Sequence, residues 1–200
     1  MTLLKNEGNV LPLDGNSGKH TLILVNNQYR RPSVEYAVDR LQREGLLDAS
    51  SVTIITEGDG VSFESAEVQE ALSIADQLII LSQSAIKLNI NDQAIKAIHQ
   101  KGGQAILLSL NLPYDAGTYD DVDAILCAYQ YYGNAHDEEG NGPFNLNLAV
   151  AVCTAFGQFV PQGKLPVNVP VVENGADGSA NFLDDILYSR GFGLDNWGSN

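Results

Sequence analysis

The sequence predicts an α/β fold, a three-layer α/β/α sandwich around a mostly parallel sheet of five or six strands. Two observations carry this prediction. Short apolar runs alternate with segments of helical period between residues 20 and 160, and 44% of the 200 residues are hydrophobic, enough to fill a sizeable core. Because strands that alternate with helices form right-handed βαβ units, we expect parallel strands with helices on both faces.

Five apolar runs are expected to form the strands. They span residues 20–27, 51–56, 77–84, 104–110 and 123–129. The run at 77–84, "QLIILSQS", is almost continuously apolar at its start, which suits a strand buried on both faces.

Four segments between or after these runs are expected to be helices. They span residues 33–47, 65–76, 91–103 and 144–159. Ser33 is expected to cap the first helix and Asn91 the third, because both residue types accept hydrogen bonds from free N–H groups at a helix start. Gly102 stands where the third helix should end in a left-handed residue.

The pattern changes from Pro161 onward, where prolines and glycines interrupt the chain. The stretch "KLPVNVP" (164–170) is expected to form a short extended piece at a sheet edge, and "ENGADGSANF" (173–182) a loop. The rest of the tail is expected to be irregular. The chain therefore reads as one domain with an N-terminal linker (3–19), a sandwich core (20–160) and a closing tail (161–200).

Composition excludes several functions. Eleven basic and 25 acidic residues give a net charge of −14, so we expect no nucleic-acid binding and no attraction to anionic membranes. No apolar run reaches the roughly 18 residues of a membrane span, and the N-terminus has no apolar signal-peptide segment. The compartment, cytoplasmic or secreted and cell-wall-associated, depends on any signal upstream.

No cofactor or metal is expected. Cys127 and Cys153 lie in apolar surroundings and suit buried thiols better than a disulfide or a metal site. The stretch "DGNSGKHT" is not a phosphate-binding loop, because Leu13 stands where the first glycine is needed and His20 replaces the Ser/Thr. No dinucleotide fingerprint follows any expected strand.

Ligands of open α/β sheets bind at the carboxyl ends of the strands. Four loops should lie there, at 26–32, 83–90, 111–117 and 130–143. Their polar residues are the candidates for facing a substrate or a neighbouring domain: Asn27, Arg30, Arg31, Gln83, Tyr114, Asp115 and Tyr131. A turn at Pro113 should present Tyr114 and Asp115 at this edge, although Asp115 also suits a helix N-cap.

The loop at 130–143 also carries three consecutive acids, Asp137, Glu138 and Glu139, which are candidates for a catalytic acid/base. Consecutive side chains point in different directions, and the spacing of a calcium loop is absent. A solvated loop is therefore the simpler interpretation of these acids.

Four motifs follow one another along the chain. They are "LLKNEGNVLPL" (3–13), "NLPYD" (111–115), "PQGKLPVNVP" (161–170) and "LYSRGFGL" (187–194). Together they resemble the C-terminal domain of glycoside hydrolase family 3, whose members look like "LLKN-x-x-x-x-LPL", "P-x-G-K-L-P-V-x-x-P" and "LYPFGYGL". Here Ser189 and Arg190 stand for Pro and Phe of the last motif, and Phe192 stands for Tyr.

The resemblance implies a three-layer sandwich that follows a (β/α)8 barrel in the same parent chain. That barrel carries the aspartate nucleophile of a retaining mechanism, which needs two carboxyl groups roughly 5–5.5 Å apart across a β-linked saccharide. These 200 residues contain no such barrel, which typically needs about 250. The chain is therefore expected to be an accessory domain without activity of its own.

The resemblance also bears on the substrate. In the glucosidase-like branch of the family, a long loop after the third strand of this domain supplies the acid/base glutamate. Here residues 83–91 contain no carboxylate. The N-acetylhexosaminidase branch keeps a His–Asp pair on the barrel instead, so we expect a parent that releases β-linked N-acetylglucosamine from cell-wall saccharides. Two alternatives stay open: a β-glucosidase-type parent, and a free-standing α/β carbohydrate-binding or interaction module without catalysis.

Overall fold

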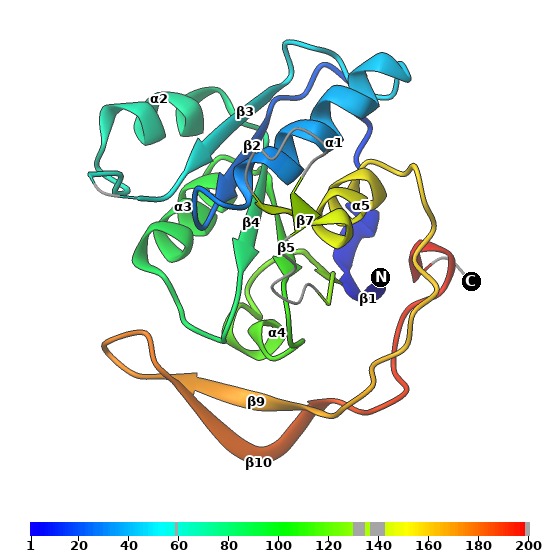
Figure 1. Ribbon diagram of the computed structural model, residues 1–200. Coiled ribbons are helices and arrows are strands. Elements are labelled where there is room, and N and C mark those ends of the chain that lie inside the picture. Colours follow the sequence, from blue (N-terminus) through cyan, green and yellow to red (C-terminus); the bar gives the residue numbers. More distant parts are fainter. Residues whose placement is uncertain (59, 130–134, 137–142, 199–200) are drawn as a thin grey trace.

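The computed structural model describes residues 1–58, 60–129, 135–136 and 143–198 (Figure 1). Its centre is a six-stranded sheet in the order β1-β6-β5-β4-β2-β3, in which β2 to β6 run parallel and β1 pairs antiparallel with β6. The strands are β1 (Thr2–Asn6), β2 (Thr21–Val25), β3 (Val52–Thr56), β4 (Gln77–Ser82), β5 (Gln104–Ser109) and β6 (Ala124–Cys127). The predicted mostly parallel sheet is confirmed, and β4 is buried along its whole length, as expected.

Helices cover both faces of this sheet. One face carries α1 (Arg31–Arg43) and α5 (Leu146–Ala155), which pack against each other, and the other carries α2 (Ala66–Ile74) and α3 (Asn89–Gln100) (Figure 1). Residues of β2 alternate between the two cores: Ile23 belongs to the α1/α5 core and Leu22 to the α2/α3 core. The predicted three-layer sandwich is confirmed. No helix in the described ranges is long and apolar enough to cross a membrane.

Shorter elements complete the fold. A single-turn helix, α4 (Asp115–Thr118), follows β5, and two short strands, β7 (Ala135–His136) and β8 (Pro143–Phe144), pair antiparallel before α5. Two 3-10 turns, η1 (Glu7–Asn9) and η2 (Asn196–Gly198), lie near the chain ends.

Two predicted helix caps are wrong. Helix α1 starts at Arg31, so Ser33 lies inside its first turn, where its buried hydroxyl accepts a hydrogen bond from the Asn145 N–H at 2.8 Å. Helix α3 starts at Asn89, and Asn91 is a buried residue of its first turn. In both cases a side chain that could cap is used in a tertiary contact instead. The expected helix end is confirmed, because Gly102 has a φ of 74° directly after the C-cap residue.

The expectation of a mostly irregular tail is wrong. Strands β9 (Val169–Asn174) and β10 (Ala180–Tyr188) form an antiparallel hairpin that lies beside the sandwich and contacts α4 (Figure 1). Of the predicted loop at 173–182, only residues 175–179 form the turn of this hairpin, and the rest belongs to its two strands. The extended piece expected at 164–170 overlaps β9 only at Val169 and Pro170, and a two-stranded ribbon has only edge strands, which tolerate proline.

The predicted N-terminal linker is also partly wrong, because its first residues form β1 of the sheet. This strand meets two segments of the tail. The N–H of Gly163 donates to the Met1 carbonyl at 2.9 Å, Leu165 N–H donates to the Phe192 carbonyl at 2.8 Å, and Leu194 N–H donates to the Leu3 carbonyl at 2.8 Å. We call these three segments, residues 1–3, 163–165 and 191–194, the terminal clasp. Three of the four motifs seen in the sequence contribute to it.

The terminal clasp requires glycine at Gly193, because a Cβ there would lie 2.4 Å from the Gly163 carbonyl oxygen. We expect Gly193→Ala to lower the free energy of unfolding by about 1–3 kcal/mol, as overpacking does in well-packed interiors. Gly58→Ala is the matched control, since a Cβ there meets no described atom within 4 Å. Urea denaturation of both variants tests this prediction, and equal stability of the two would contradict it.

Candidate functional site

Five parallel strands end at the same edge of the sheet. The loops that follow β2, β3, β4, β5 and β6 therefore lie side by side, and we call the described part of this surface the strand-end edge. The predicted loops at 26–32, 83–90 and 111–117 all fall on it.

Asp115 organises the centre of the strand-end edge. It is the first residue of α4 and is fully buried. Its Oδ1 accepts hydrogen bonds from the Ser82 hydroxyl at 2.7 Å and from the Ala85 N–H at 3.0 Å, and its Oδ2 accepts one from the Ser109 hydroxyl at 3.3 Å. One carboxylate thus ties the last residues of β4 and β5 to the loop after β4.

Burial dominates the electrostatics of this carboxyl group. It raises the pKa of Asp115 to about 6, although the hydrogen bonds from Ser82, Ala85 and Ser109 favour the charged form. Desolvation outweighs the donors because no cationic side chain is among them. Asp115 is therefore a positioning residue whose charge changes in mildly acidic solution.

The backbone at the strand-end edge is strained. Four non-glycine residues that follow β4, β5 or β6 have left-handed backbone angles: Ser84 (φ 71°), Ala85 (φ 53°), Asn111 (φ 57°) and Tyr129 (φ 52°). Each such residue costs of order 1–3 kcal/mol and persists only where its surroundings hold it, a pattern that gathers at functional sites. Ala85 is held in this conformation by the hydrogen bond that its N–H donates to the Asp115 carboxylate.

Tyr119 fixes the rest of the loop after β4. Its buried hydroxyl accepts a hydrogen bond from the Leu88 N–H at 2.7 Å and lies 3.2 Å from the Ile86 carbonyl, to which it donates. Burial raises the pKa of Tyr119 to about 12, so the hydroxyl keeps its proton at neutral pH. The loop after β4 is consequently held by two side chains, Asp115 and Tyr119, which both come from the segment after β5.

Glu57 is a further carboxyl group of this edge, and sequence reasoning missed it. It follows β3, and its N–H donates to the Val25 carbonyl at the end of β2. Its Oε1 is buried without a hydrogen-bond partner among the described residues, and burial raises the pKa of Glu57 to about 7. A carboxyl group that titrates near neutral pH is chemically suited to proton transfer. Its position directly after an expected strand was the available signal.

The predicted edge residues differ in accessibility. The structure corrects the expectation for Asp115, which is buried, and for Arg30, which is 5% exposed and hydrogen-bonds the Asn26 side chain. Asp115 is also not an N-cap, because Tyr114 occupies that position. The partly exposed candidates are Asn27, Arg31, Gln83 and Tyr114. The remaining ones, Tyr131, Asp137, Glu138 and Glu139, lie outside the described residues.

Two of the accessible candidates, Arg31 and Tyr114, contact side chains of other elements. The Arg31 guanidinium pairs with Glu35 at 2.6 Å and also reaches the Thr56 hydroxyl at 3.3 Å, so it leans toward β3. The Tyr114 ring packs edge-on against Phe182 of β10, with centroids 5.6 Å apart. The hairpin therefore covers part of the strand-end edge near β5, whereas Arg31 lies beside β3, the last strand on one side of the sheet.

Large apolar side chains are exposed along the strand-end edge. One lies in each of the loops after β2, β4 and β5, and one at the start of α5. They are Tyr29 (62% exposed), Ile86 (46%), Leu112 (51%) and Leu146 (62%). Single exposed apolar residues are ordinary, but a series on one edge of a fold is typical of a surface that another protein segment covers.

Thiols and metal ligands add no further chemistry in the described residues. Cys127 and Cys153 are buried free cysteines, and burial raises the pKa of the Cys127 thiol to about 12. No three His, Cys, Asp or Glu side chains within the described ranges are grouped to hold a metal ion.

Solved structures with this fold were found by structural comparison. One is a fungal multi-domain β-N-acetylglucosaminidase of glycoside hydrolase family 3, reported with a GCN5-related glucosamine N-acetyltransferase region (TM-score 0.57, 20% identity). The match covers 88% of this chain and 18% of that one. Another is a β-glucosidase from Listeria innocua in complex with isofagomine (TM-score 0.59, 16% identity), where the match covers 98% of this chain and 32% of that one.

The chain thus has a fold that occurs within a β-N-acetylglucosaminidase of glycoside hydrolase family 3 and within a β-glucosidase, and it spans only about a fifth to a third of the length of these two. No protein-family model and no curated protein matches the sequence. At these identities the comparison defines the fold, and the fold agrees with the one that the sequence motifs imply.

The raised pKa of Asp115 predicts how stability depends on pH. The folded-state pKa of about 6 exceeds the unfolded value of about 3.9, so the group stabilises the fold below about pH 4 and loses this contribution as pH rises through 6. The difference corresponds to about 3 kcal/mol. We therefore expect the stability of Asp115→Asn, relative to wild type, to increase by this order between pH 4 and pH 7.

Urea denaturation at four pH values between 4 and 7 measures this difference. Asp184→Asn, on the exposed part of β10, is the control and should change little relative to wild type across the range. A constant gap between Asp115→Asn and wild type at all four pH values would refute the assignment.

Proposed function

We propose that the chain is the accessory C-terminal domain of an exo-acting, retaining β-glycosidase of glycoside hydrolase family 3. In this proposal the strand-end edge docks against a (β/α)8 barrel of the same parent protein, and the barrel carries the catalytic nucleophile. The N-terminal linker (3–19), the sandwich core (20–160) and the closing tail (161–200) then form one domain.

The fold and the terminal clasp support this proposal. A β-N-acetylglucosaminidase of that family and a β-glucosidase contain the same fold in a part of their length, as one domain of a larger protein would. The motifs that carry the resemblance are also structurally coherent, because "LLKN", "GKLP" and "GFGL" meet in the terminal clasp. Their contact in the folded chain gives a physical reason why these motifs occur together in one sequence.

The observation that carries the proposal is the character of the strand-end edge. Exposed apolar side chains and strained loops gather at the carboxyl ends of the strands, where open α/β sheets bind their ligands. A barrel also places its active site at the carboxyl ends of its strands. Two such faces must oppose each other if both are to border one sugar.

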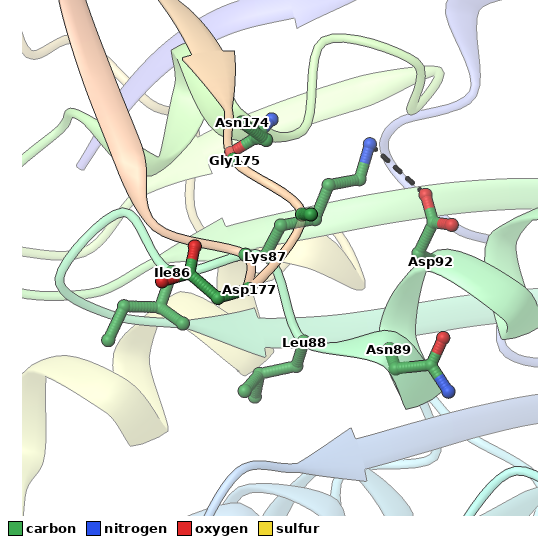
Figure 2. Close-up of a pocket in the computed structure, with 10 residues that line it drawn as sticks. Ile86, Lys87, Leu88, Asn89, Asp92, Asn174, Gly175 and Asp177 are labelled. Carbon is green, nitrogen blue, oxygen red and sulfur yellow. Dashed lines mark ion pairs between the residues drawn. The ribbon is translucent and has the colours of Figure 1, made fainter.

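The preferred substrate of the parent is a saccharide with β-linked N-acetylglucosamine. Residues 83–91 contain no carboxylate, so this loop cannot supply the acid/base of the glucosidase-like branch. The next acid, Asp92, is held by ion pairs with Lys87 at 3.1 Å (Figure 2) and Lys96 at 2.6 Å. Burial acts to raise the pKa of Asp92, but the two lysines together outweigh it and lower the pKa, which makes Asp92 a poor proton donor at neutral pH.

Docking can be tested with two matched surface variants in the longer parent protein. Leu112, on the strand-end edge, and Ile74, at the end of α2, are 51% and 54% exposed. Leu112→Asp should lower kcat/KM on an aryl β-N-acetylglucosaminide at least about tenfold by placing a charge in an apolar contact, whereas Ile74→Asp should leave it unchanged. The 200-residue chain alone should not hydrolyse this substrate or an aryl β-glucoside.

Equal activity of Leu112→Asp and Ile74→Asp would place the barrel elsewhere. Turnover by the isolated chain that survives repurification would overturn the accessory role itself. The parent should also prefer the N-acetylglucosaminide over the glucoside.

The carboxyl groups of this domain should be dispensable for catalysis. We expect Asp137→Ala, Glu138→Ala, Glu139→Ala and Glu57→Gln, made singly in the parent, to keep kcat within about tenfold of wild type, or about 1.4 kcal/mol of barrier. A true acid/base contributes about 10²–10⁴ in rate. A loss of several hundredfold in one variant that added azide restores would identify that residue as the acid/base and move the parent to the glucosidase-like branch.

A further inference from the structure

A pocket of about 350 Å³ lies on the outer face of the second half of α1. It is lined by Tyr36, Arg40, Arg43 and Glu44. Positions 36, 40 and 43 follow one another at the spacing of helical turns, so their side chains share one face of the helix. Because α1 joins the end of β2 to the start of the parallel strand β3, its last turn lies toward the edge of the sheet opposite the strand-end edge. A ligand of this pocket would therefore not compete with docking at the strand-end edge.

The Arg40 guanidinium is held in place at this pocket. Its Nε pairs with a Glu44 carboxylate oxygen at 3.0 Å, and the group lies over the Phe159 ring, 6.0 Å from the centroid. The other Glu44 oxygen accepts a hydrogen bond from the Gln158 amide. Both oxygens of Glu44 are thus engaged, whereas the two terminal nitrogens of Arg40 have no hydrogen bond or ion pair within the described part of the chain. These donors are available to a ligand on a side chain that is already positioned.

Arg43 supplies a positive charge that the pocket lining does not balance. Its Nε donates to the Asp39 carbonyl at 3.4 Å, and no acidic side chain among the described residues forms an ion pair with it. The lining therefore carries two guanidinium groups against one carboxylate, in a chain whose net charge is −14. A guanidinium group presents paired N–H donors that match the oxygens of a carboxylate or a phosphate.

Aromatic rings border these two cations. Tyr36 lines the pocket and is 44% exposed, and Phe159 under Arg40 is 40% exposed. Flat apolar groups pack on such rings and on guanidinium planes. The pocket volume, at the small end of the range for small-molecule sites, suits a ligand of about one ring. We infer that this pocket binds a small oxyanion, a carboxylate or a phosphate monoester, carried on a flat apolar group. The oxyanion lies between Arg40 and Arg43, and the flat group packs on Tyr36.

A titration of the ¹⁵N-labelled 200-residue chain with five small probes tests this inference. The probes are benzoate, phenyl phosphate, acetate, inorganic phosphate and benzamide. We expect saturable shifts of the Arg40 and Arg43 Nε–H signals with at least one of the two aryl anions. Acetate and inorganic phosphate, which lack the ring, and benzamide, which lacks the charge, should bind more weakly. The tighter of the two aryl anions tells whether the site prefers a carboxylate or a phosphate.

Arg43→Gln should weaken binding of the aryl anion at least about tenfold, because hydrogen bonds to a charged group are lost. Arg190→Gln is the matched control, since it removes the same charge from an exposed arginine outside the pocket and should change binding little. Tyr36→Ala should weaken binding about threefold or more through the lost ring contact. A dispersed spectrum verifies that each variant is folded.

Several outcomes would overturn the inference. They are the absence of a saturable shift with either aryl anion, binding of benzamide or acetate as tight as that of benzoate and phenyl phosphate, and equal losses in Arg43→Gln and Arg190→Gln. None of these results would decide whether the strand-end edge docks to a barrel.

Discussion

The close approach of three backbone segments in the terminal clasp is the constraint on which the tail of this protein depends. The Gly163 N–H reaches Met1, and Gly193 lies so close to the Gly163 carbonyl that no side chain fits between them. The clasp anchors the tail to β1, a strand of the central sheet. From that fixed point the chain can run out into β9 and return through β10, so the hairpin is held at both ends. Through the hairpin, the N-terminal residues of the terminal clasp are thus connected to the strand-end edge.

The hairpin also contacts α4, the short helix that begins with the buried Asp115. Gly117 of α4 lies against Pro170 and Val172 of β9, and Asp115 at the start of the same turn binds the ends of β4 and β5. A buried carboxylate is costly, and removing only its partners would leave an unpaired charge. The Asp115 carboxylate fixes the relative positions of the groups it binds more strictly than apolar packing would, because each hydrogen bond has a direction. That directionality is what holds Ala85 in a left-handed conformation.

The parts of the fold that depend on periodicity were predictable from the sequence, and those that depend on tertiary contact were not. The five parallel strands could be predicted from apolar runs such as "QLIILS", and the four helices from their helical periodicity, because both patterns are local in the sequence. Strand β1 was missed because "TLLKN" is a strand only once β6 is beside it. The hairpin was missed because its stability comes from α4 and the terminal clasp. At the strand-end edge three of the four predicted loops, at 26–32, 83–90 and 111–117, follow the strands as expected. The burial of Asp115 and Arg30 depends on neighbours distant in sequence, and Glu57 was overlooked because its pKa shift arises from burial.

The loop after β4 shows why these contacts bear on function. Four consecutive residues have a backbone group held by another part of the fold: Ala85 by Asp115, Ile86 and Leu88 by Tyr119, and Lys87 by Gly178. A catalytic acid on this loop would have to extend toward a substrate and approach it closely, which needs a longer and freer segment. A loop that is short, without carboxylates and held at four consecutive residues does not have this freedom. On a backbone that these contacts hold in place, the loop presents the Ile86 side chain, which is 46% exposed.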